Sequence, residues 1–257
     1  MDIIICVKAV PSKLIEKNYA GSSVYCINPY DAFSIKQMLE FRKVVTCTIT
    51  CVCMGPEGAR EVLVRCLAMG ADKAVLASDS RFEGSDTFAT SYILSKVIEK
   101  LNYDLIVCGQ MALDGETGQV QYGLAQRLGM ICISKVQSVQ SQEDNSLIIK
   151  YVNDEMIHLV QAKAPLMISF DDFCEYANVS LFALQQARRK EITVWNALDL
   201  SLNQEECGLI GSKTKVLRSR QHHVQARETV LLDDTSGNIT DFLINQIKSI
   251  NNLKEKR

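Results

Sequence analysis

The sequence predicts an α/β protein with a parallel sheet that carries helices on both faces. Three observations support this fold class: strand-like apolar runs alternate with amphipathic segments, a glycine-rich loop follows one such run, and hairpin-like strands follow later. Strands that alternate with helices of this length lie parallel, because each helix returns the chain to the starting edge of the sheet. The 257 residues are 47% hydrophobic, so the chain can bury a sizeable core.

Strand–helix units follow one another from the N-terminus. Each predicted strand is a short apolar run, and the predicted helices show apolar residues at helical spacing or a capping residue at the start. Ser85 or Asp86 can cap the third helix. The predicted strands span residues 3–7, 44–53, 74–77 and 104–108, and the predicted helices span residues 31–42, 57–69, 87–101 and 117–128.

After Met130 the pattern changes to strands joined by polar turns. Residues 131–139, 147–152, 157–162 and 166–170 are expected to form an antiparallel extension. Helices are expected at 181–189 and 239–250. We place one α/β domain at residues 1–190. Residues 191–257 are expected to form a C-terminal arm that contacts a partner, because their apolar pattern is too thin for a core of their own.

Composition and charge exclude several functions. The formal net charge of −2 argues against nucleic-acid binding, which needs a basic surface. No apolar run approaches the ~20 residues of a membrane-spanning helix. The ten cysteines are scattered through apolar runs, as expected of free thiols in a cytoplasmic protein, and lack the paired spacing of a metal site.

The stretch from Cys108 to Gln119 carries the strongest functional signal. An apolar run, residues 105–108, ends in glycine, a polar glycine-rich loop follows, and a helical pattern begins at about Thr117. This arrangement presents backbone N–H groups and a helix dipole to a phosphate. Asp114 and Glu116 within the loop could cap the helix or hydrogen-bond a ribose. The sequence therefore predicts a nucleotide site.

Other strand ends are expected at the same edge of the sheet. Lys8 follows the first strand and Met54 ends the second; alone, they are equally compatible with a solvated lysine and a plain turn. The chain lacks the G-x-G-x-x-G, P-loop and G-x-S-x-G motifs, and no histidine stands near a strand end. We expect a nucleotide to be bound without covalent chemistry on it.

Motifs found in order along the chain resemble the β subunit of electron-transfer flavoprotein over residues 1 to about 250. Any one of them is weak, but the set in register is highly specific. The motifs are Val7-Lys8-x-Val10-Pro11, Asn28-Pro29-Tyr30-Asp31, Met54-Gly55-Pro56, Leu67-Ala68-Met69-Gly70-Ala71-Asp72, Gly84-Ser85-Asp86-Thr87 and Asp114-Gly115-Glu116-Thr117-Gly118-Gln119.

The resemblance implies an adenine-nucleotide-binding, Rossmann-like fold and a heterodimer with an α subunit that holds one FAD. Asn28 and Asp31 would lie near the adenosine, and residues 117–119 would open a helix and face phosphate. Carried over by position, the pocket comprises Cys6, Lys8, Asn28, Asp31, Met54, Asp114, Gly115, Glu116, Thr117, Gly118 and Gln119, with Val120, Gln121 and Gly123 behind.

The resemblance also leaves a choice of nucleotide. The simple family members hold a structural AMP in the β subunit, whereas the bifurcating members of anaerobes hold FAD there, which accepts hydride from NADH. Residues 114–120, and residues 208–216 with Lys213 in place of a proline, resemble the bifurcating branch. We therefore expect FAD, with AMP as the alternative. Oxidoreductase activity is expected only within the heterodimer or a larger dehydrogenase complex.

Residues 173–190 resemble the family's recognition loop, which docks on an acyl-CoA dehydrogenase-type flavoprotein. Leu181 aligns with the anchoring leucine, and Phe182 and Leu184 accompany it. The alternative is that these residues pack on their own subunit, as apolar residues at helical spacing usually do. A third hypothesis for the whole chain is an ATP-using enzyme on a similar fold. It is disfavoured because no Ser-Gly-Gly-x-Asp-Ser-type loop follows the first strand.

Overall fold

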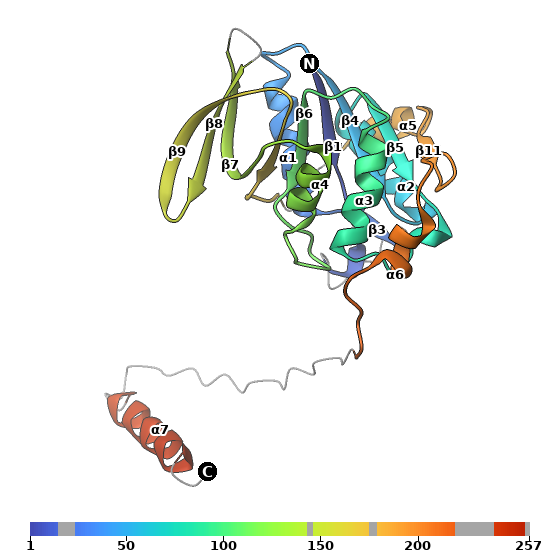
Figure 1. Ribbon diagram of the computed structural model, residues 1–257. Coiled ribbons are helices and arrows are strands. Elements are labelled where there is room, and N and C mark those ends of the chain that lie inside the picture. The colour runs from blue at the N-terminus through green and yellow to red at the C-terminus, as the bar shows by residue number, and fades with distance from the viewer. Residues whose placement is uncertain (15–23, 143–145, 175–178, 219–238, 255–257) are drawn as a thin grey trace. The chain divides into compact units, whose positions relative to one another are not determined.

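The computed structural model describes residues 1–14, 24–142, 146–174, 179–218 and 239–254. The chain forms a compact unit, Met1–Lys215, and a second unit, Val216–Arg257. The described part of the second unit contains helix α7 (Ile239–Lys254), which confirms the helix predicted at 239–250 (Figure 1).

A nine-stranded sheet forms the centre of the first unit, in the order β11-β5-β4-β1-β6-β10-β7-β8-β9 (Figure 1). From β11 to β7 the strands run parallel, and β8 and β9 continue the sheet antiparallel. The strands are β1 (Asp2–Cys6), β4 (Thr48–Met54), β5 (Lys73–Ala77), β6 (Leu105–Gly109), β7 (Cys132–Ser141), β8 (Ser146–Asn153), β9 (Met156–Lys163), β10 (Leu166–Phe170) and β11 (Thr193–Trp195). Strands β2 (Ala9–Pro11) and β3 (Tyr25–Ile27) pair separately.

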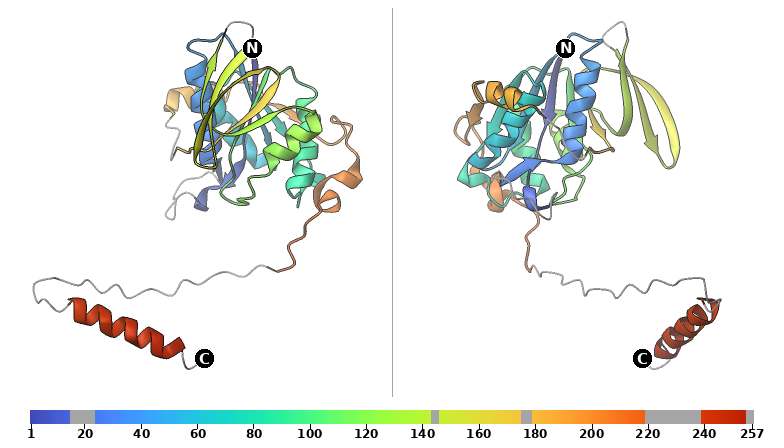
Figure 2. Two further views of the ribbon diagram at one scale, coloured as in Figure 1. Left: turned by 60° about the vertical axis from the view of Figure 1, so that its left-hand side comes forward. Right: turned by 180° about the vertical axis from the view of Figure 1, so that it is seen from behind.

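Helices cover both faces of the sheet, as predicted (Figure 2). Helices α1, α2 and α5 lie on one face, where the core includes Ile3 and Ile5 of β1. Helices α3 and α4 lie on the other face, where the core includes Ile4 of the same strand, because successive side chains alternate between faces. The helices are α1 (Pro29–Phe41), α2 (Arg60–Met69), α3 (Thr87–Ile98), α4 (Val120–Leu128), α5 (Leu181–Ala187) and the short α6 (Gly208–Gly211), with 3₁₀ turns at Ser12–Leu14, Glu57–Ala59, Ser80–Phe82 and Gln204–Glu206.

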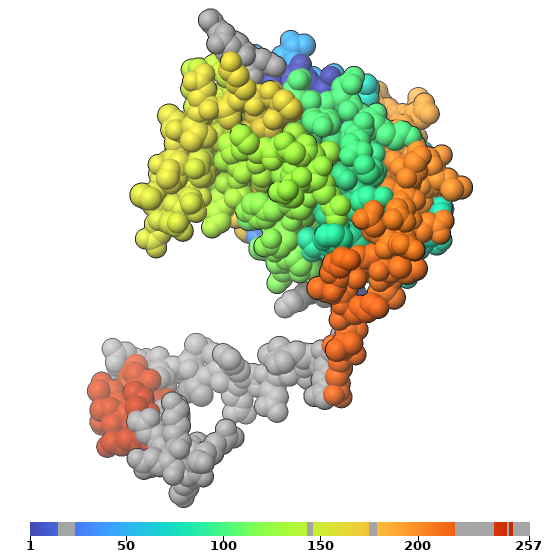
Figure 3. All heavy atoms as spheres, in the orientation of Figure 1, coloured from blue at the N-terminus to red at the C-terminus, as the bar shows by residue number. Residues whose placement is uncertain are grey.

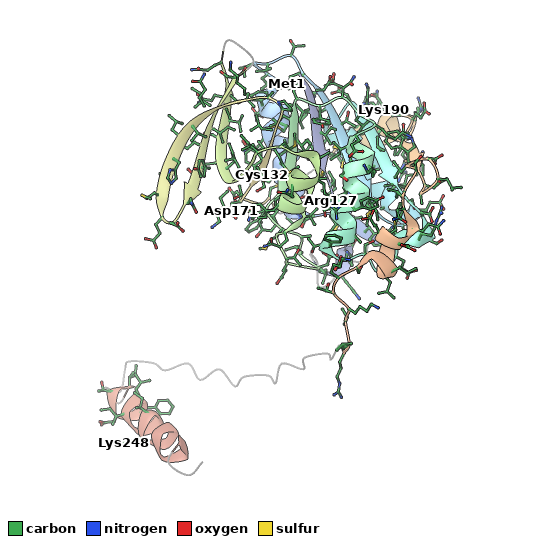
Figure 4. All side chains as sticks on the ribbon, in the orientation of Figure 1. Met1, Arg127, Cys132, Asp171, Lys190 and Lys248 are labelled. Atoms are coloured by element: carbon green, nitrogen blue, oxygen red, sulfur yellow. The ribbon has the colours of Figure 1, made fainter. Side chains whose placement is uncertain are left out.

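The strand order reverses between β1 and β6. From β1 the chain builds outward through β4 and β5 and then returns to place β6 on the other side of β1. Ligands of parallel sheets bind at such a reversal, beyond the carboxyl ends of the strands. Figure 4 helps to orient the sheet, because Met1 precedes β1 at the upper end and Asp171 follows β10 at the lower end.

The structure differs from the predicted elements in particular places. Strand β4 begins at Thr48 rather than at residue 44, because the chain turns after α1: the N–H groups of Val44 and Val45 both donate to the carbonyl of Phe41. Strand β10 lies parallel between β6 and β7, so only β8 and β9 extend the sheet antiparallel. Helix α4 begins at Val120 rather than at Thr117.

Residues 191–215 belong to the compact unit, so this unit ends at Lys215 rather than at residue 190. Strand β11 pairs with β5 and adds an edge to the sheet. Ala197, Leu200 and Cys207 are buried in the core on the side of α3 and α4. In Figure 3 the atoms of this segment (orange) lie beside those of α3.

Strand β9 forms the opposite edge of the sheet. Its side chains include the exposed apolar groups of Met156, Ile157 and Leu159, and Leu159 is 70% exposed.

All ten cysteines are free thiols. Among the described residues, no helix combines the length and the apolar character needed to cross a membrane. Within the same ranges, no cluster of His, Cys, Asp or Glu side chains is suited to hold a metal ion.

Candidate functional site

A cavity of about 370 Å³ lies at the carboxyl ends of β1, β4 and β6, where the strand order reverses. This volume falls within the range of about 300–1,000 Å³ typical of small-molecule sites. Buried side chains of Val52, Leu94 and Cys108 give the cavity an apolar wall. The predicted site residues that line it are Cys6, Lys8, Asn28, Asp31, Met54, Gly115, Glu116, Thr117, Gly118, Gln119, Val120 and Gln121.

Asp31 joins the ends of the two strands that flank the reversal. Its carboxylate accepts hydrogen bonds from the backbone N–H of Lys8, at 2.8 Å, and of Gly109, at 3.2 Å. Burial raises the pKa of the Asp31 carboxyl to about 7, although these hydrogen bonds and one from Asn28 act to lower it. A side chain at position 109 would collide with this carboxylate and with Tyr30, so the close approach requires glycine.

Asn28 fixes the loop that follows β6. Its side-chain amide donates to the carbonyl of Met111, at 2.8 Å, and accepts from the N–H of Leu113, at 3.3 Å. Both ends of the side chain are therefore engaged by protein. Asn28 and Asp31 line the cavity chiefly as supports of its walls.

Lys8 and Asp114 form an ion pair at the cavity. Lys8 Nζ lies 2.7 Å from Asp114 Oδ1, and the two side chains are 47% and 29% exposed. Asp114 does not line the cavity itself, whereas Lys8 does. The lysine thus brings a positive charge to the cavity and shares it with a carboxylate of the loop.

The loop before α4 turns sharply, and the N-terminus of the helix has no side-chain cap. Glu116 and Gly118 have left-handed backbone conformations, with φ of 50° and 59°. Gln119 occupies the N-cap position of α4, but its side chain makes no capping hydrogen bond. The first N–H groups of a helix have no partner within the helix, and they lie at the positive end of its dipole. The cavity lining at residues 117–121 therefore suits an anion.

Gln121 and Gly123 have supporting positions. Gln121 is buried, and its side-chain amide donates to the carbonyl of Gln110, at 3.2 Å. Gly123 does not line the cavity. A Cβ atom there would lie 2.9 Å from Ser91 Oγ, so this glycine permits the close packing of α4 on α3.

The structure adds lining residues that the site prediction lacked: Ser85, Asp86, Thr87, Thr90 and Thr214. Asp86 caps α3, since its Oδ1 accepts from the N–H groups of Phe88 and Ala89, at 3.0 Å each. The Gly84–Thr87 motif contains Ser85, Asp86 and Thr87, so it was a signal for these three residues. Thr214 reaches the cavity from a distant part of the chain, and the signal for it was the resemblance of residues 208–216 to the bifurcating branch.

The predicted docking residues separate into exposed and packed groups. Leu181 is 81% exposed and Phe182 is 69% exposed, at the start of α5. Leu184 packs against the core instead, beside the buried Ala187. The self-packing alternative therefore holds for Leu184, and the outward apolar surface consists of Leu181 and Phe182.

These features define the class of protein: an α/β fold with a ligand cavity at the strand-order reversal of its parallel sheet. The family follows from sequence comparison. The model of the electron transfer flavoprotein domain matches residues 19–200, and the chain belongs to the electron transfer flavoprotein family.

Similar proteins extend the match to almost the whole chain. The electron transfer flavoprotein subunit beta of Thermoanaerobacterium thermosaccharolyticum is 30% identical, over 98% of this chain and 98% of its own length. Subunit CarD of the caffeyl-CoA reductase–Etf complex of Acetobacterium woodii is 30% identical, over 96% of this chain and 98% of its own length. Protein FixA of Azorhizobium caulinodans is 30% identical, over 96% of this chain and 94% of its own length. The resemblance identified from the motifs is confirmed.

Proposed function

We propose that this chain holds an adenine nucleotide in the cavity described above and acts in electron transfer as the β subunit of a heterodimer. The observation that carries the proposal is the glycine-containing loop that leads into the uncapped start of α4 at the wall of this cavity. The family and the names of its relatives support the role in electron transfer.

The donors around the cavity fit a nucleotide. The start of α4, the hydroxyl of Thr117 and the ammonium of Lys8 would hold phosphate, because all are hydrogen-bond donors in the lining of the cavity. The apolar wall that includes Val52 and Leu94 would take the adenine ring. Asp31 and Asn28 would hold these groups in place by fixing the strand ends and the loop.

We propose FAD as the nucleotide, with NADH as the transient electron donor and the FAD of the α subunit as the acceptor. A bound flavin supplies hydride acceptance and electron transfer, which no side chain of this protein can supply. The residues around the cavity would bind and orient it. AMP is the alternative, favoured by a cavity volume near the lower end of the range for small-molecule sites.

The proposed partners are an α subunit and an acyl-CoA dehydrogenase-type flavoprotein. The name of the CarD protein places that relative in a reductase complex, which supports such a partner here. Leu181 and Phe182 would dock on it, since exposed apolar side chains at the start of a capped helix can enter a pocket of another protein. The C-terminal arm would contact the α subunit. The free thiols fit a reducing compartment such as the cytoplasm.

The test is the nucleotide content of the heterodimer co-expressed with its α subunit. Denaturation releases the nucleotides, which are then separated by chromatography. Two FAD per heterodimer and no AMP would support a redox flavin in this chain. One FAD with one AMP would select the alternative, in which the chain positions the flavin of its partner. A heterodimer with no nucleotide beyond that of the α subunit would overturn the proposal.

A further inference from the structure

Asp86 connects two distant parts of the chain at the cavity. One carboxylate oxygen caps α3 through the N–H groups of Phe88 and Ala89. The other accepts from the N–H of Lys213, at 2.7 Å, and from the N–H and hydroxyl of Thr214, at 2.8 and 3.0 Å. A single side chain therefore fixes the start of α3 and a segment more than a hundred residues downstream.

Residues 208–214 make further specific contacts with the chain around Asp86. The N–H of Asp86 donates to Ser212 Oγ, at 2.8 Å, and the N–H of Leu209 donates to the carbonyl of Glu83, at 3.0 Å. Gly208 has φ of 56°, and a Cβ atom there would collide with the backbone carbonyls of Arg81 and Glu83. Residues 208–214 thus attach to residues 81–86 through specific backbone contacts.

The attachment places Thr214 in the wall of the cavity, beside Asp86 and Thr87. The hydroxyl of Thr87 in turn lies 3.3 Å from that of Thr117 in the loop before α4. Burial acts to raise the pKa of the Asp86 carboxyl, but the hydrogen bonds from Ala89, Thr214 and Lys213 outweigh it and lower the pKa, so the group is ionised at neutral pH. An ionised acceptor makes the stronger kind of hydrogen bond.

We propose that Asp86 is a positioning residue that holds residues 212–214 as one wall of the nucleotide cavity, so that nucleotide binding and the ordering of residues 208–215 are coupled. This inference rests on the proposed nucleotide function. Coupling between sites is reciprocal, so a ligand that uses this wall must also stabilise it. The second unit begins at Val216, directly after this segment. Nucleotide occupancy therefore controls the order of the segment that directly precedes the second unit.

The test uses the heterodimer stripped of nucleotide and titrated with AMP, whose adenylate group FAD shares. Asp86→Asn keeps an oxygen that can cap α3, since asparagine is also a good N-cap, but its amide NH₂ cannot accept the bonds from Lys213 and Thr214. We expect calorimetry to show AMP binding weakened about tenfold or more, as for the loss of charge-assisted hydrogen bonds. Hydrogen exchange should show that AMP protects residues 208–215 in the wild type and no longer does so in the variant.

Matched variants separate this role from a general loss of stability. Thr214→Val should weaken AMP binding, and Thr214→Ser, which restores the hydroxyl, should rescue it. Asp79→Asn is the control, because Asp79 also caps a helical turn and holds a downstream segment, through the N–H of Ala197 at 3.0 Å, but does not line the cavity. Its AMP affinity should stay within about twofold of the wild type.

Two results would overturn the coupling alone: an Asp86→Asn heterodimer that binds AMP within twofold of the wild type, or wild-type exchange at 208–215 that AMP leaves unchanged. A wild-type heterodimer in which this chain binds neither AMP nor FAD would overturn the proposed function and the coupling together.

Discussion

Replacement of Asp31 by asparagine is expected to remove the contribution of this carboxyl group to the pH dependence of stability. The Asp31 carboxyl is buried between the ends of β1 and β6, and burial raises its pKa to about 7. Its oxygens accept from the backbone N–H groups of Lys8 and Gly109. An asparagine can accept only one of these bonds and does not titrate, so the variant is less stable but lacks this pH dependence.

The sign and the size follow from linkage. The folded-state pKa lies above the unfolded value of about 3.9, so the folded protein binds this proton more tightly. The resulting stabilisation is complete below about pH 4 and is lost as the pH rises to about 7. At 1.36 kcal/mol per pKa unit, the free energy of unfolding should fall by about 2.5 kcal/mol between pH 5 and pH 8 through this group.

The assay is urea denaturation of the wild type and of Asp31→Asn at pH 5 and at pH 8. The decrease in unfolding free energy between the two pH values should be about 2.5 kcal/mol smaller in the variant. Asp104→Asn is the control, because the Asp104 carboxylate also accepts a backbone N–H, from Asp2 at 2.7 Å, near the opposite end of β1. The Asp104→Asn variant should keep the pH dependence of stability that Asp31 causes. Equal decreases in the wild type and in Asp31→Asn would refute the reasoning.

Three further substitutions test the site and the docking surface. Gly109→Ala would place a Cβ atom 2.6 Å from Tyr30 Cβ and should lower the free energy of unfolding by about 1–3 kcal/mol in urea denaturation; unchanged stability would show that this approach relaxes freely. Lys8→Ala removes an exposed pair with Asp114, so stability should change by less than about 1 kcal/mol, while calorimetry should show AMP binding weakened about tenfold. Leu181→Glu should leave thermal stability unchanged within about 0.5 kcal/mol but slow electron transfer to the proposed partner dehydrogenase, and unaltered transfer would remove Leu181 from the proposed docking surface.

Local patterns predicted the parts of the fold that local physics determines. The strands of the parallel core were found from short apolar runs, the loop after β6 from the glycines that follow its run, and Asp86 was recognised as a possible cap. The β2–β3 pair was not predicted, because each strand has three residues, too few to show the alternation of a strand. Residues 44–47 were assigned to β4 because β-branched residues favour strands, although Val44 is 82% exposed in a turn.

Local patterns do not predict where an element lies in the sheet or which distant segments meet. Residues 166–170 were predicted as a strand, but their insertion between β6 and β7 depends on packing across the whole sheet. The motifs predicted half of the cavity lining, because the ends of parallel strands converge. Thr214 was not predicted as a site residue, although it lies within the recognised residues 208–216. Its place at the cavity depends on hydrogen bonds to the distant Asp86, which leave no periodic signal in the sequence.

The edge strand β9 has a practical consequence for work with the isolated chain. Among the described residues no strand pairs with its outer backbone, and Lys163 is the one charged residue in its sequence. A long edge with exposed Ile157 and Leu159 is a template for self-association, which natural sheets usually oppose with charges or proline. Preparations should therefore become turbid at high concentration, and a lysine at position 159 should raise the solubility limit without unfolding the sheet.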